Sequence, residues 1–280
     1  MRWTCSIFHM VTYTVWPRLY TLPPYSIGWP YIITNPRRKQ WALSYLRRHK
    51  EKVESIIIDS GVEIFRSGKK DYPGGPMRWF QRMLELRREI GRILGDKEIY
   101  IVSPDYPADY PGNTIENNVE KTIRVLEKIL ELHGSEGIIG VLQGDPIWVD
   151  KDLSRFQQHI SLYRDLAGQV EYWAVGTLCT LSSIRIWGIP EREAIRWIRR
   201  TVETARETIG NRKLHIFGLW LRALPAVKNA IYSFDSQAWT RPVSRRLKRN
   251  WSAKNTEERE IYFKAWIRRY LSIVRQKQLL

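Results

Sequence analysis

Short apolar runs alternate with amphipathic segments along most of the chain, and this alternation limits the folds available to it. Runs such as Ile56–Ile58 and Ile138–Leu142 are apolar at every position, which is typical of strands buried on both faces. The segments between the runs carry apolar residues at helical spacing, most clearly in the stripe of Ile115, Val119, Ile123, Leu126, Ile129 and Leu130. The pattern therefore predicts an α/β fold in which helices cover a parallel sheet.

The number of apolar runs favours a closed (β/α)8 barrel over an open doubly wound sheet. A single barrel domain commonly has about 250 residues, so residues 1–280 fit one such domain. The glycine fingerprints G-x-G-x-x-G and G-x-x-x-x-G-K-[ST] of open-sheet nucleotide binders do not occur in the sequence. Strands are expected around Ser6–Thr14 and at Tyr31–Thr34, Ile56–Ile58, Ile99–Val102, Ile138–Leu142, Tyr172–Val175, Leu214–Phe217 and Ile231–Phe234.

Helices are expected between these strands, with boundaries set by capping residues and glycines. One should cover about residues 77–93, another about residues 150–167, and a third should begin near Pro190. Asn113 and Glu116 resemble a capping box at the start of a helix that Gly134 ends. A basic amphipathic helix of about residues 256–275 should close the chain.

Positive charge is concentrated at the two ends of the chain, whose formal net charge is +17. Residues 1–52 hold nine Lys or Arg against one Glu, and residues 245–280, a basic C-terminal helical extension, hold eleven against three. Clustered positive charge attracts polyanions through counterion release, which predicts a nucleic-acid partner. The alternative interpretation is a solvated surface of the kind found in thermophilic proteins.

The cysteine content and hydropathy exclude several classes of protein. Cys5 and Cys179 are the only cysteines, so we expect neither a disulfide framework nor a zinc site built on several thiolates, and a reducing compartment is indicated. The sequence has no apolar run of about 18 residues and no signal-peptide pattern. We therefore predict a soluble cytoplasmic protein with no membrane partner, no metal and no cofactor.

Several apolar runs end in a polar residue or a glycine, and these ends are the candidate site. The residues are Asp59, Asp105, Gln143, Gly176 and Asp235, with Phe217-Gly218 at one further end. Active sites of such barrels form at the carboxyl ends of the strands, so these residues should converge. Each aspartate taken alone could be a turn or cap residue. Three converging carboxylates repel one another unless a ligand or a shared proton relieves them, which indicates a functional site.

The motifs at these ends resemble the tRNA-guanine transglycosylase superfamily. They are Ile58-Asp59-Ser60-Gly61, Pro104-Asp105, Val141-Leu142-Gln143-Gly144, Ala174-Val175-Gly176, Phe217-Gly218, and Phe234-Asp235 with Thr240-Arg241. The match in order and approximate spacing covers about residues 55–242. The resemblance implies exchange of guanine in a nucleic acid for a 7-deazaguanine such as preQ0.

The resemblance also implies a role for each matching residue. Asp235 would be the nucleophile that attacks the ribose and forms a covalent intermediate, as carboxylates do in retaining glycosidases. Asp59 would be the second catalytic acid. The base would be bound by Asp105, Gln143, Gly176, the backbone at Tyr172 and Trp173, and the stacking side chain of Phe217. Arg241 would contact phosphate, and His215, inside an apolar run, is interpreted as a core histidine.

Three departures from the family pattern point to its DNA-directed branch. Residues 242–280 contain no Cys and no His, so the zinc subdomain of the tRNA enzymes is absent. Val62 and Glu63 replace a glycine and an aromatic residue, which leaves Phe65 as a possible cover for the base. Tyr172 and Trp173 replace small residues at the pocket edge. DNA is the favoured partner; the alternatives are a tRNA transglycosylase without its zinc module and a non-catalytic nucleic-acid-binding barrel.

The basic segment after Arg241 generates the first testable prediction. Arg245, Arg246, Lys248 and Arg249 are expected to bind phosphates. Neutralising all four should weaken DNA binding for every sequence alike and flatten the dependence of affinity on salt concentration, because fewer counterions are released. Binding isotherms over a salt series measure this. An unchanged slope would exclude this segment from the interface.

Overall fold

The computed structural model describes residues 9–14, 25–28, 36–53, 55–62, 65, 70–108, 113–145, 153–176, 178 and 189–235 of the chain. The predicted strand at Tyr31–Thr34 lies outside these ranges, as does the predicted helix over residues 256–275. Arg241 and the basic extension of residues 245–280 also lie outside them.

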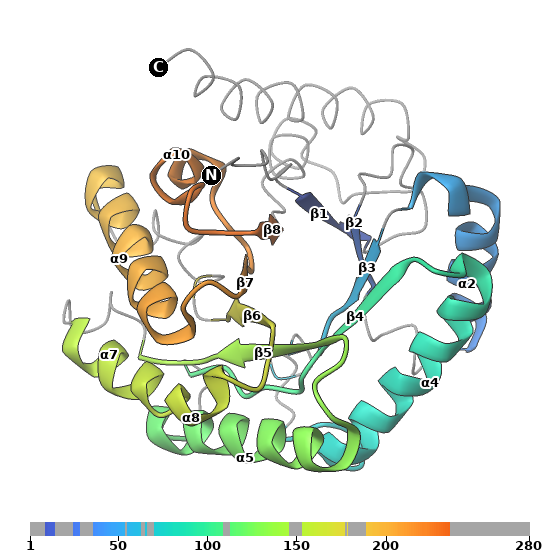
Figure 1. Cartoon of the computed structure of the whole chain (residues 1–280), viewed down its shortest axis with the longest axis horizontal. Coiled ribbons are helices and arrows are strands. Elements are labelled where there is room, and N and C mark those ends of the chain that lie inside the picture. The colour runs from blue at the N-terminus through green and yellow to red at the C-terminus, as the bar shows by residue number, and fades with distance from the viewer. Residues whose placement is uncertain are drawn as a thin grey trace.

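Eight described strands form one parallel sheet that curls on itself (Figure 1). Each strand pairs with the next along the chain, and β1 also pairs with β8, with His9 opposite Ser233 and Val11 opposite Asp235. The strands are β1 His9–Thr14, β2 Tyr25–Gly28, β3 Ser55–Ile58, β4 Glu98–Val102, β5 Ile138–Leu142, β6 Tyr172–Val175, β7 Lys213–Ile216 and β8 Ser233–Asp235.

Helices follow most of these strands and lie around the outside of the sheet (Figure 1). The longest three have amphipathic sequences and bury one face each. None of the helices within the described ranges is long and apolar enough to cross a membrane. The helices are α2 Pro36–His49, η1 Lys50–Lys52, α4 Pro76–Leu94, α5 Ile115–His133, α7 Leu153–Ser161, α8 Arg164–Ala167, α9 Glu191–Ile209, η3 Leu221–Ala223 and α10 Leu224–Val227.

The predicted α/β class with a curled, all-parallel sheet is confirmed. The complete eightfold alternation of strand and helix stays a prediction, because the connection from β1 to β2 and everything after β8 lie outside the described residues. The helices expected over residues 77–93 and after Pro190 are confirmed as α4 and α9.

Two helix predictions are wrong in detail. The single helix expected over residues 150–167 is two helices, α7 and α8, separated by a turn at which Tyr163 is fully buried and packs against Trp173. The N-cap of α5 is Thr114, whose hydroxyl accepts the backbone N–H of Asn117 at 3.2 Å. Asn113 instead donates its side-chain amide to Asn118, so the expected capping box with Glu116 does not form.

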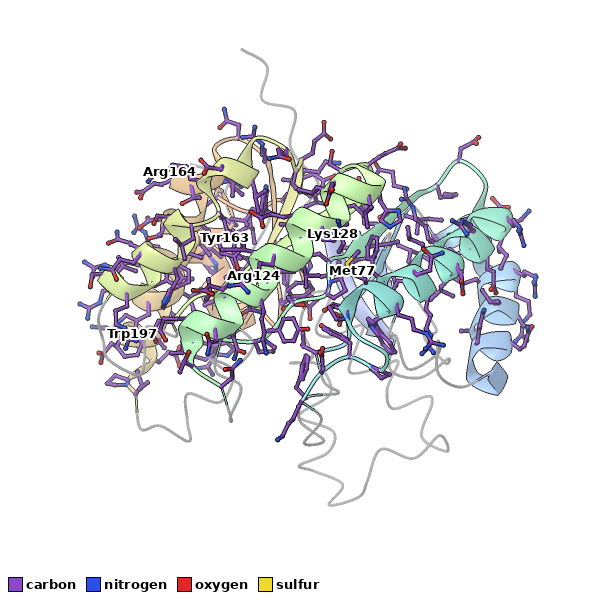
Figure 2. The ribbon with its side chains drawn as sticks, turned by 90° about the horizontal axis from the view of Figure 1, so that it is seen from below. Met77, Arg124, Lys128, Tyr163, Arg164 and Trp197 are labelled. Carbon is purple, nitrogen blue, oxygen red and sulfur yellow. The ribbon has the colours of Figure 1, made fainter. Side chains whose placement is uncertain are left out.

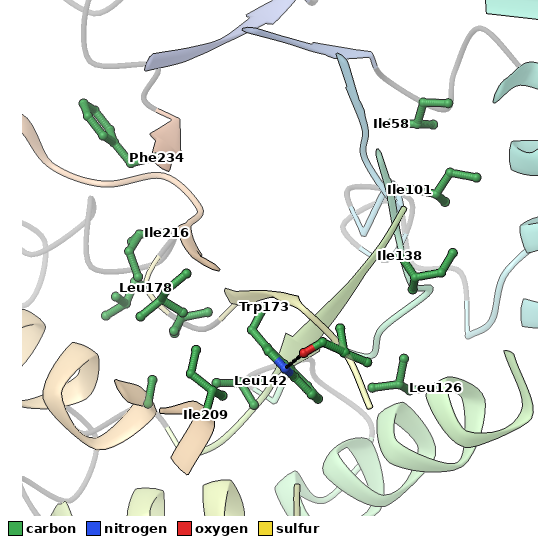
Figure 3. Close-up of a cluster of buried hydrophobic side chains, with 14 of the residues drawn as sticks. Ile58, Ile101, Leu126, Ile138, Leu142, Trp173, Leu178, Ile209, Ile216 and Phe234 are labelled. Atoms are coloured by element: carbon green, nitrogen blue, oxygen red, sulfur yellow. Dashed lines mark hydrogen bonds between the residues drawn. The ribbon is translucent and has the colours of Figure 1, made fainter. Parts of the chain in front are cut away.

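Alternation along the strands divides the buried side chains into two sets. The outward-facing set packs against the helices and includes Ile58, Ile101 and Ile216 (Figure 3). The same apolar cluster contains Leu126 from α5 and Ile209 from α9. The inward-facing set fills the space that the sheet encloses and comprises Ile57, Val102, Ile139, Val141, Tyr172, Ala174 and Phe217. Both faces are thus buried, as the apolar runs predict.

The outer helix faces are polar and carry ion pairs. Arg124 and Lys128 lie on the outer face of α5 in Figure 2, where Arg124 pairs with Glu120 and Lys128 with Glu131. Such exposed pairs contribute at most about 1 kcal/mol each to the free energy of unfolding. The stability of the fold therefore depends on the two buried sets of side chains.

Two glycine substitutions test this packing. A Cβ at Gly140 would lie 2.7 Å from the Trp173 ring, which is fully buried and donates its indole N–H to the Val170 carbonyl. Gly140→Ala should lower the free energy of unfolding by about 1–3 kcal/mol. Gly91→Ala, the control inside α4, meets nothing closer than 3.8 Å and should raise it by about 0.5–1 kcal/mol. Denaturant unfolding of both variants measures this, and equal effects would contradict the packing argument.

Candidate functional site

The strands deliver the predicted site residues to one end of the sheet. Asp59, Gln143, Gly176 and Phe217 directly follow β3, β5, β6 and β7, and Asp235 is the last residue of β8. Asp105 comes three residues after β4. All strands are parallel, so these positions share the carboxyl edge.

Three of these side chains form, together with Ser60, a buried polar group that we call the Asp105 cluster: Asp59, Ser60, Asp105 and Gln143. The Ser60 hydroxyl donates to Oδ1 of Asp105 at 2.7 Å and lies 3.4 Å from Oδ1 of Asp59. The Gln143 amide donates to Oδ2 of Asp105 at 2.6 Å. Residues after three successive strands are therefore joined by direct hydrogen bonds, as their convergence predicts.

Tyr72 fixes the backbone of Asp105. Its hydroxyl donates to the Asp105 carbonyl at 2.8 Å and accepts the Asp105 backbone N–H at 3.1 Å. Burial raises the pKa of the Tyr72 phenol well above its usual value, so the hydroxyl stays protonated and keeps both roles. Trp79 fixes the neighbouring turn by donating its indole N–H to the Ser60 carbonyl at 2.8 Å.

The contacts of Gln143 determine the orientation of its amide. Its Oε1 accepts the backbone N–H of Ala108 at 3.3 Å, so its Nε2 is the atom that faces Asp105. The amide lies directly against Gly176, where a Cβ would approach Nε2 to 2.3 Å. Only glycine fits there without displacing Gln143, and this contact brings the end of β6 into the Asp105 cluster.

The Asp105 carboxyl is 3% exposed, and loss of solvation raises its pKa to about 6. The hydrogen bonds from Ser60 and Gln143 act in the opposite direction, because both stabilise the ionised form. Asp105 therefore carries its charge at neutral pH and can accept hydrogen bonds from the edge of a ligand. This arrangement of one anionic acceptor and one amide suits recognition of a group with several donors and acceptors.

Asp59 occupies a turn at the end of β3. Its Oδ1 accepts the backbone N–H of Gly61 at 3.2 Å, so part of its role is the turn contact that an aspartate at a strand end commonly makes. The side chain is buried and lies beside Ser60. The structure thus gives Asp59 a local structural function, and its predicted function as an acid stays a prediction.

Asp235 lies in a second polar group, which we call the Asp235 cluster: Asp235, His215, Ser233 and Gly218. Its side chain is 0% exposed. Oδ1 accepts the backbone N–H of Gly218 at 2.8 Å and lies 3.3 Å from Nε2 of His215, whereas Oδ2 has no hydrogen-bond partner among the described residues. Gly218 has φ +65°, a conformation that favours glycine and turns its N–H toward the carboxylate.

The same contacts affect the pKa of the Asp235 carboxyl. Burial raises the pKa of the Asp235 carboxyl above its usual value, and the hydrogen bonds from His215 and Gly218 oppose that rise. An uncompensated buried oxygen is costly in free energy. A buried carboxylate with one anchored oxygen and one oxygen that no described residue binds has the features of a nucleophile.

The structure describes four further predicted residues: Phe217, Tyr172, Trp173 and Phe65. Phe217 belongs to the inward-facing set and its ring packs 4.6 Å from that of His215. Tyr172 and Trp173 begin β6, so their backbones pair with β5 and β7 instead of lying at the carboxyl edge. Tyr172 points inward, whereas Trp173 points outward (Figure 3) and its ring packs edge-on against that of Tyr163. Phe65 is buried against Tyr72 and Tyr106.

The predicted phosphate-binding residues Arg241, Arg245, Arg246, Lys248 and Arg249 lie outside the described residues. Within the described ranges, no three His, Cys, Asp or Glu side chains are placed to hold a metal ion.

Sequence reasoning missed several members of the two clusters and one residue that contacts them, Tyr72. It assigned no role to Ser60, Tyr72, Gly218 or Ser233 and interpreted His215 as a core residue. His215 is indeed buried and hydrogen-bonded, but one of its contacts is Asp235. The pattern that could have revealed this is the strand period: His215 precedes Phe217 by two residues and Ser233 precedes Asp235 by two, so each pair faces the same side.

The raised pKa of Asp105 predicts how stability depends on pH. The folded protein binds this proton more tightly than the unfolded chain, so the free energy of unfolding should fall as pH rises from about 4 to about 6. The side-chain amide of Asp105→Asn cannot titrate. The free energy of unfolding of this variant minus that of the wild type should therefore increase by up to about 3 kcal/mol as pH rises over that range. Asp165→Asn, which removes an exposed carboxylate, is the control. Denaturant unfolding at several pH values measures the difference, and a constant difference would contradict the burial argument.

Two comparisons with known proteins identify no family for this chain. No protein-family model matches the chain, and a search of curated proteins finds no significant sequence match.

Proposed function

We propose that the protein is a transglycosylase that exchanges guanine in DNA for a 7-deazaguanine through a covalent aspartyl–DNA intermediate. The observation that carries the proposal is Asp235, a fully buried carboxylate at a strand end with Oδ1 anchored and Oδ2 unpartnered among the described residues. The family resemblance of the surrounding motifs gives this carboxylate its proposed chemistry. We propose further that the curled parallel sheet is part of a complete (β/α)8 barrel.

The proposed reaction has two displacement steps. In the first, Oδ2 of Asp235 attacks C1′ of a deoxyguanosine, the C1′–N9 bond breaks, and its electron pair leaves with guanine, which takes up a proton. In the second, N9 of the incoming 7-deazaguanine attacks C1′, gives up its proton and releases the carboxylate. Asp59 is the proposed acid in the first step and base in the second. Neither step needs a redox partner, and the net change is one base for another.

The Asp105 cluster supports the proposed selectivity for guanine. A guanine presents N–H donors along its amino-bearing edge and an acceptor at its carbonyl. Asp105 offers an anionic acceptor and Gln143 an amide, and both are buried and fixed by neighbouring contacts. A site of this kind discriminates strongly, because a base with the wrong edge leaves buried polar groups unpaired. Gly176 leaves the space in which Gln143 lies.

DNA is the proposed nucleic acid because residues 1–52 and 245–280 are basic and because residues 242–280, which follow the Thr240-Arg241 motif, contain no Cys or His of the kind that binds zinc in the tRNA enzymes. Phosphate contacts position a nucleic acid without reading its sequence. A guanine in duplex DNA is stacked out of reach of a buried carboxylate, so the enzyme must take single strands or flip the base out, at a cost of a few kcal/mol. Arg241 and the basic extension are the proposed source of compensating contacts.

Substitution of Asp235 tests the nucleophile. Asp235→Asn keeps the shape of the side chain but removes the charge, so base exchange and formation of a denaturant-stable protein–DNA adduct should both be lost, while DNA binding persists. Asp145→Asn, which alters a buried aspartate paired with Arg155 outside both clusters, is the control. An adduct that still forms with Asp235→Asn and Asp235→Ala would exclude Asp235 as the nucleophile.

The choice of substrate is tested by offering the wild-type protein single-stranded DNA, duplex DNA and unmodified tRNA with a labelled 7-deazaguanine. Incorporation into DNA is the expected result. Incorporation into tRNA alone would contradict the DNA assignment and favour a tRNA transglycosylase without zinc. Tight binding with no incorporation into any of the three would indicate a non-catalytic binding protein.

A further inference from the structure

A chain of hydrogen bonds crosses the interior of the sheet and ends at Asp235. The Tyr172 hydroxyl lies 2.5 Å from Oγ of Ser233, and the same Oγ lies 2.6 Å from Nδ1 of His215. The other ring nitrogen of His215, Nε2, lies 3.3 Å from Oδ1 of Asp235. Tyr172 comes from β6, His215 from β7, and Ser233 and Asp235 from β8. All four side chains are buried.

Tyr172 fixes the direction in which the protons point. Burial raises the pKa of its phenol far above the neutral range, so the hydroxyl keeps its proton. Either hydroxyl could donate in the contact with Ser233, and we assign Tyr172 as the donor because Ser233 is the acceptor that its proton meets among the described residues. The Ser233 hydroxyl has a single proton of its own, and its second contact, Nδ1 of His215, is the acceptor of that proton.

The direction determines the tautomer of His215. Because Nδ1 accepts a hydrogen bond, the proton of the neutral ring is on Nε2, where it points to Oδ1 of Asp235. A protonated ring, or a protonated Asp235 donating to Nε2, would place a proton on Nδ1. Either change would leave the Ser233 proton with no acceptor among its described contacts. The chain thus favours a neutral His215 beside an ionised Asp235.

We propose that Tyr172, Ser233 and His215 form a relay of positioning residues that holds Asp235 ionised and oriented, with Oδ2 as the attacking atom. This inference rests on the proposed function of Asp235. The relay and the Gly218 N–H both bind Oδ1, so one oxygen is held, while Oδ2 is buried and has no hydrogen-bond partner among the described residues. Of these four residues only Asp235 contacts the substrate; the relay acts through it.

The relay also assists the second displacement, in which the carboxylate is the leaving group. A hydrogen bond to an ionised oxygen stabilises the charge that returns to Asp235 as the bond to C1′ breaks. Burial alone raises the pKa of Asp235, and the donors from His215 and Gly218 counteract it. Loss of the His215 donor should therefore move the acid limb of the rate profile to higher pH, because a larger fraction of Asp235 would be protonated at a given pH.

Other charged groups near the relay lie at its Tyr172 end. Lys213 is 5.8 Å from the centre of the Tyr172 ring, but its amine donates to the Tyr100 hydroxyl at 2.9 Å and pairs with Glu98 at 3.9 Å. Tyr100 and Tyr232 pack edge-on against Tyr172. Among the described residues, the titratable groups facing the His215 ring nitrogens are thus Asp235 directly and Tyr172 through Ser233.

The first experiment measures the proton order without any substrate. In full-length protein labelled with 15N-histidine, the chemical shifts of the ring nitrogens distinguish the two neutral tautomers and the imidazolium. His215 is one of five histidines and is assigned from the signal that a His215 variant lacks. We expect the Nε2–H tautomer near pH 7, and a mixture of tautomers in Tyr172→Phe. An Nδ1–H tautomer or an imidazolium in the wild type would overturn the relay.

The second experiment measures the rate of adduct formation on DNA as a function of pH. His215→Leu should slow adduct formation by about 10- to 100-fold near pH 7, since a hydrogen bond to a charged group is lost, and should shift the acid limb upward. His215→Gln retains an amide donor and should recover part of the rate. Tyr172→Phe and Ser233→Ala should give smaller losses with the same shift. The matched controls are Tyr100→Phe, which removes a hydrogen-bonded interior hydroxyl outside the relay, and Ser55→Ala, which removes a buried hydroxyl.

The outcomes separate the relay from the proposed function. A wild-type protein that forms no adduct overturns the proposed function, whatever the tautomer of His215. Normal adduct formation in the wild type with unchanged rates in His215→Leu overturns the relay alone. If His215→Leu does not fold, Tyr172→Phe decides: a rate and acid limb equal to those of Tyr100→Phe would overturn the relay.

Discussion

Period-two alternation along the parallel strands is the constraint on which the rest of the structure depends. Successive side chains point to opposite faces, so each strand supplies one set to the helices and one to the enclosed interior. The outward set is apolar and is covered by the helices, as Ile58 and Ile216 illustrate. The inward set is not uniformly apolar, because it carries a polar residue such as His215 or Asp235 on several strands. Those residues must find partners within the interior, since water does not reach them.

The two polar clusters differ in how their buried carboxylates are hydrogen-bonded. In the Asp105 cluster both oxygens of the Asp105 carboxylate accept a hydrogen bond, and the Tyr72 hydroxyl fixes the Asp105 backbone. The Asp105 carboxylate is therefore fixed in position before any ligand binds. In the Asp235 cluster the described residues hold Oδ1 alone, and the donors that hold it oppose the effect of burial on the pKa of Asp235. That asymmetry is costly in stability and is consistent with a reactive group, because strain and unsatisfied polarity concentrate at functional sites.

Much of the fold could be predicted from the sequence, including some strand boundaries, but several helix boundaries could not. The strands at Ile138–Leu142 and Tyr172–Val175 match β5 and β6, because runs that are apolar at every position have few alternatives to a buried strand. The start of α5 was predicted at the wrong residue, since Asn113 and Thr114 are both good N-caps and only the local backbone selects between them. The break between α7 and α8 depends on the burial of Tyr163, which is a property of its neighbours in space.

The apolar runs identify the residues at the strand ends, because each run stops at a recognisable polar residue or glycine. The order of residues alone therefore assigns Asp59, Asp105, Gln143 and Asp235 to one edge of the sheet. Their pairing, with Gln143 on Asp105 and His215 on Asp235, follows from the folded arrangement of the strands. A hydrogen bond requires two atoms at a defined distance and angle. Sheet curvature and strand register set those distances, and neither is encoded in any one segment of the chain.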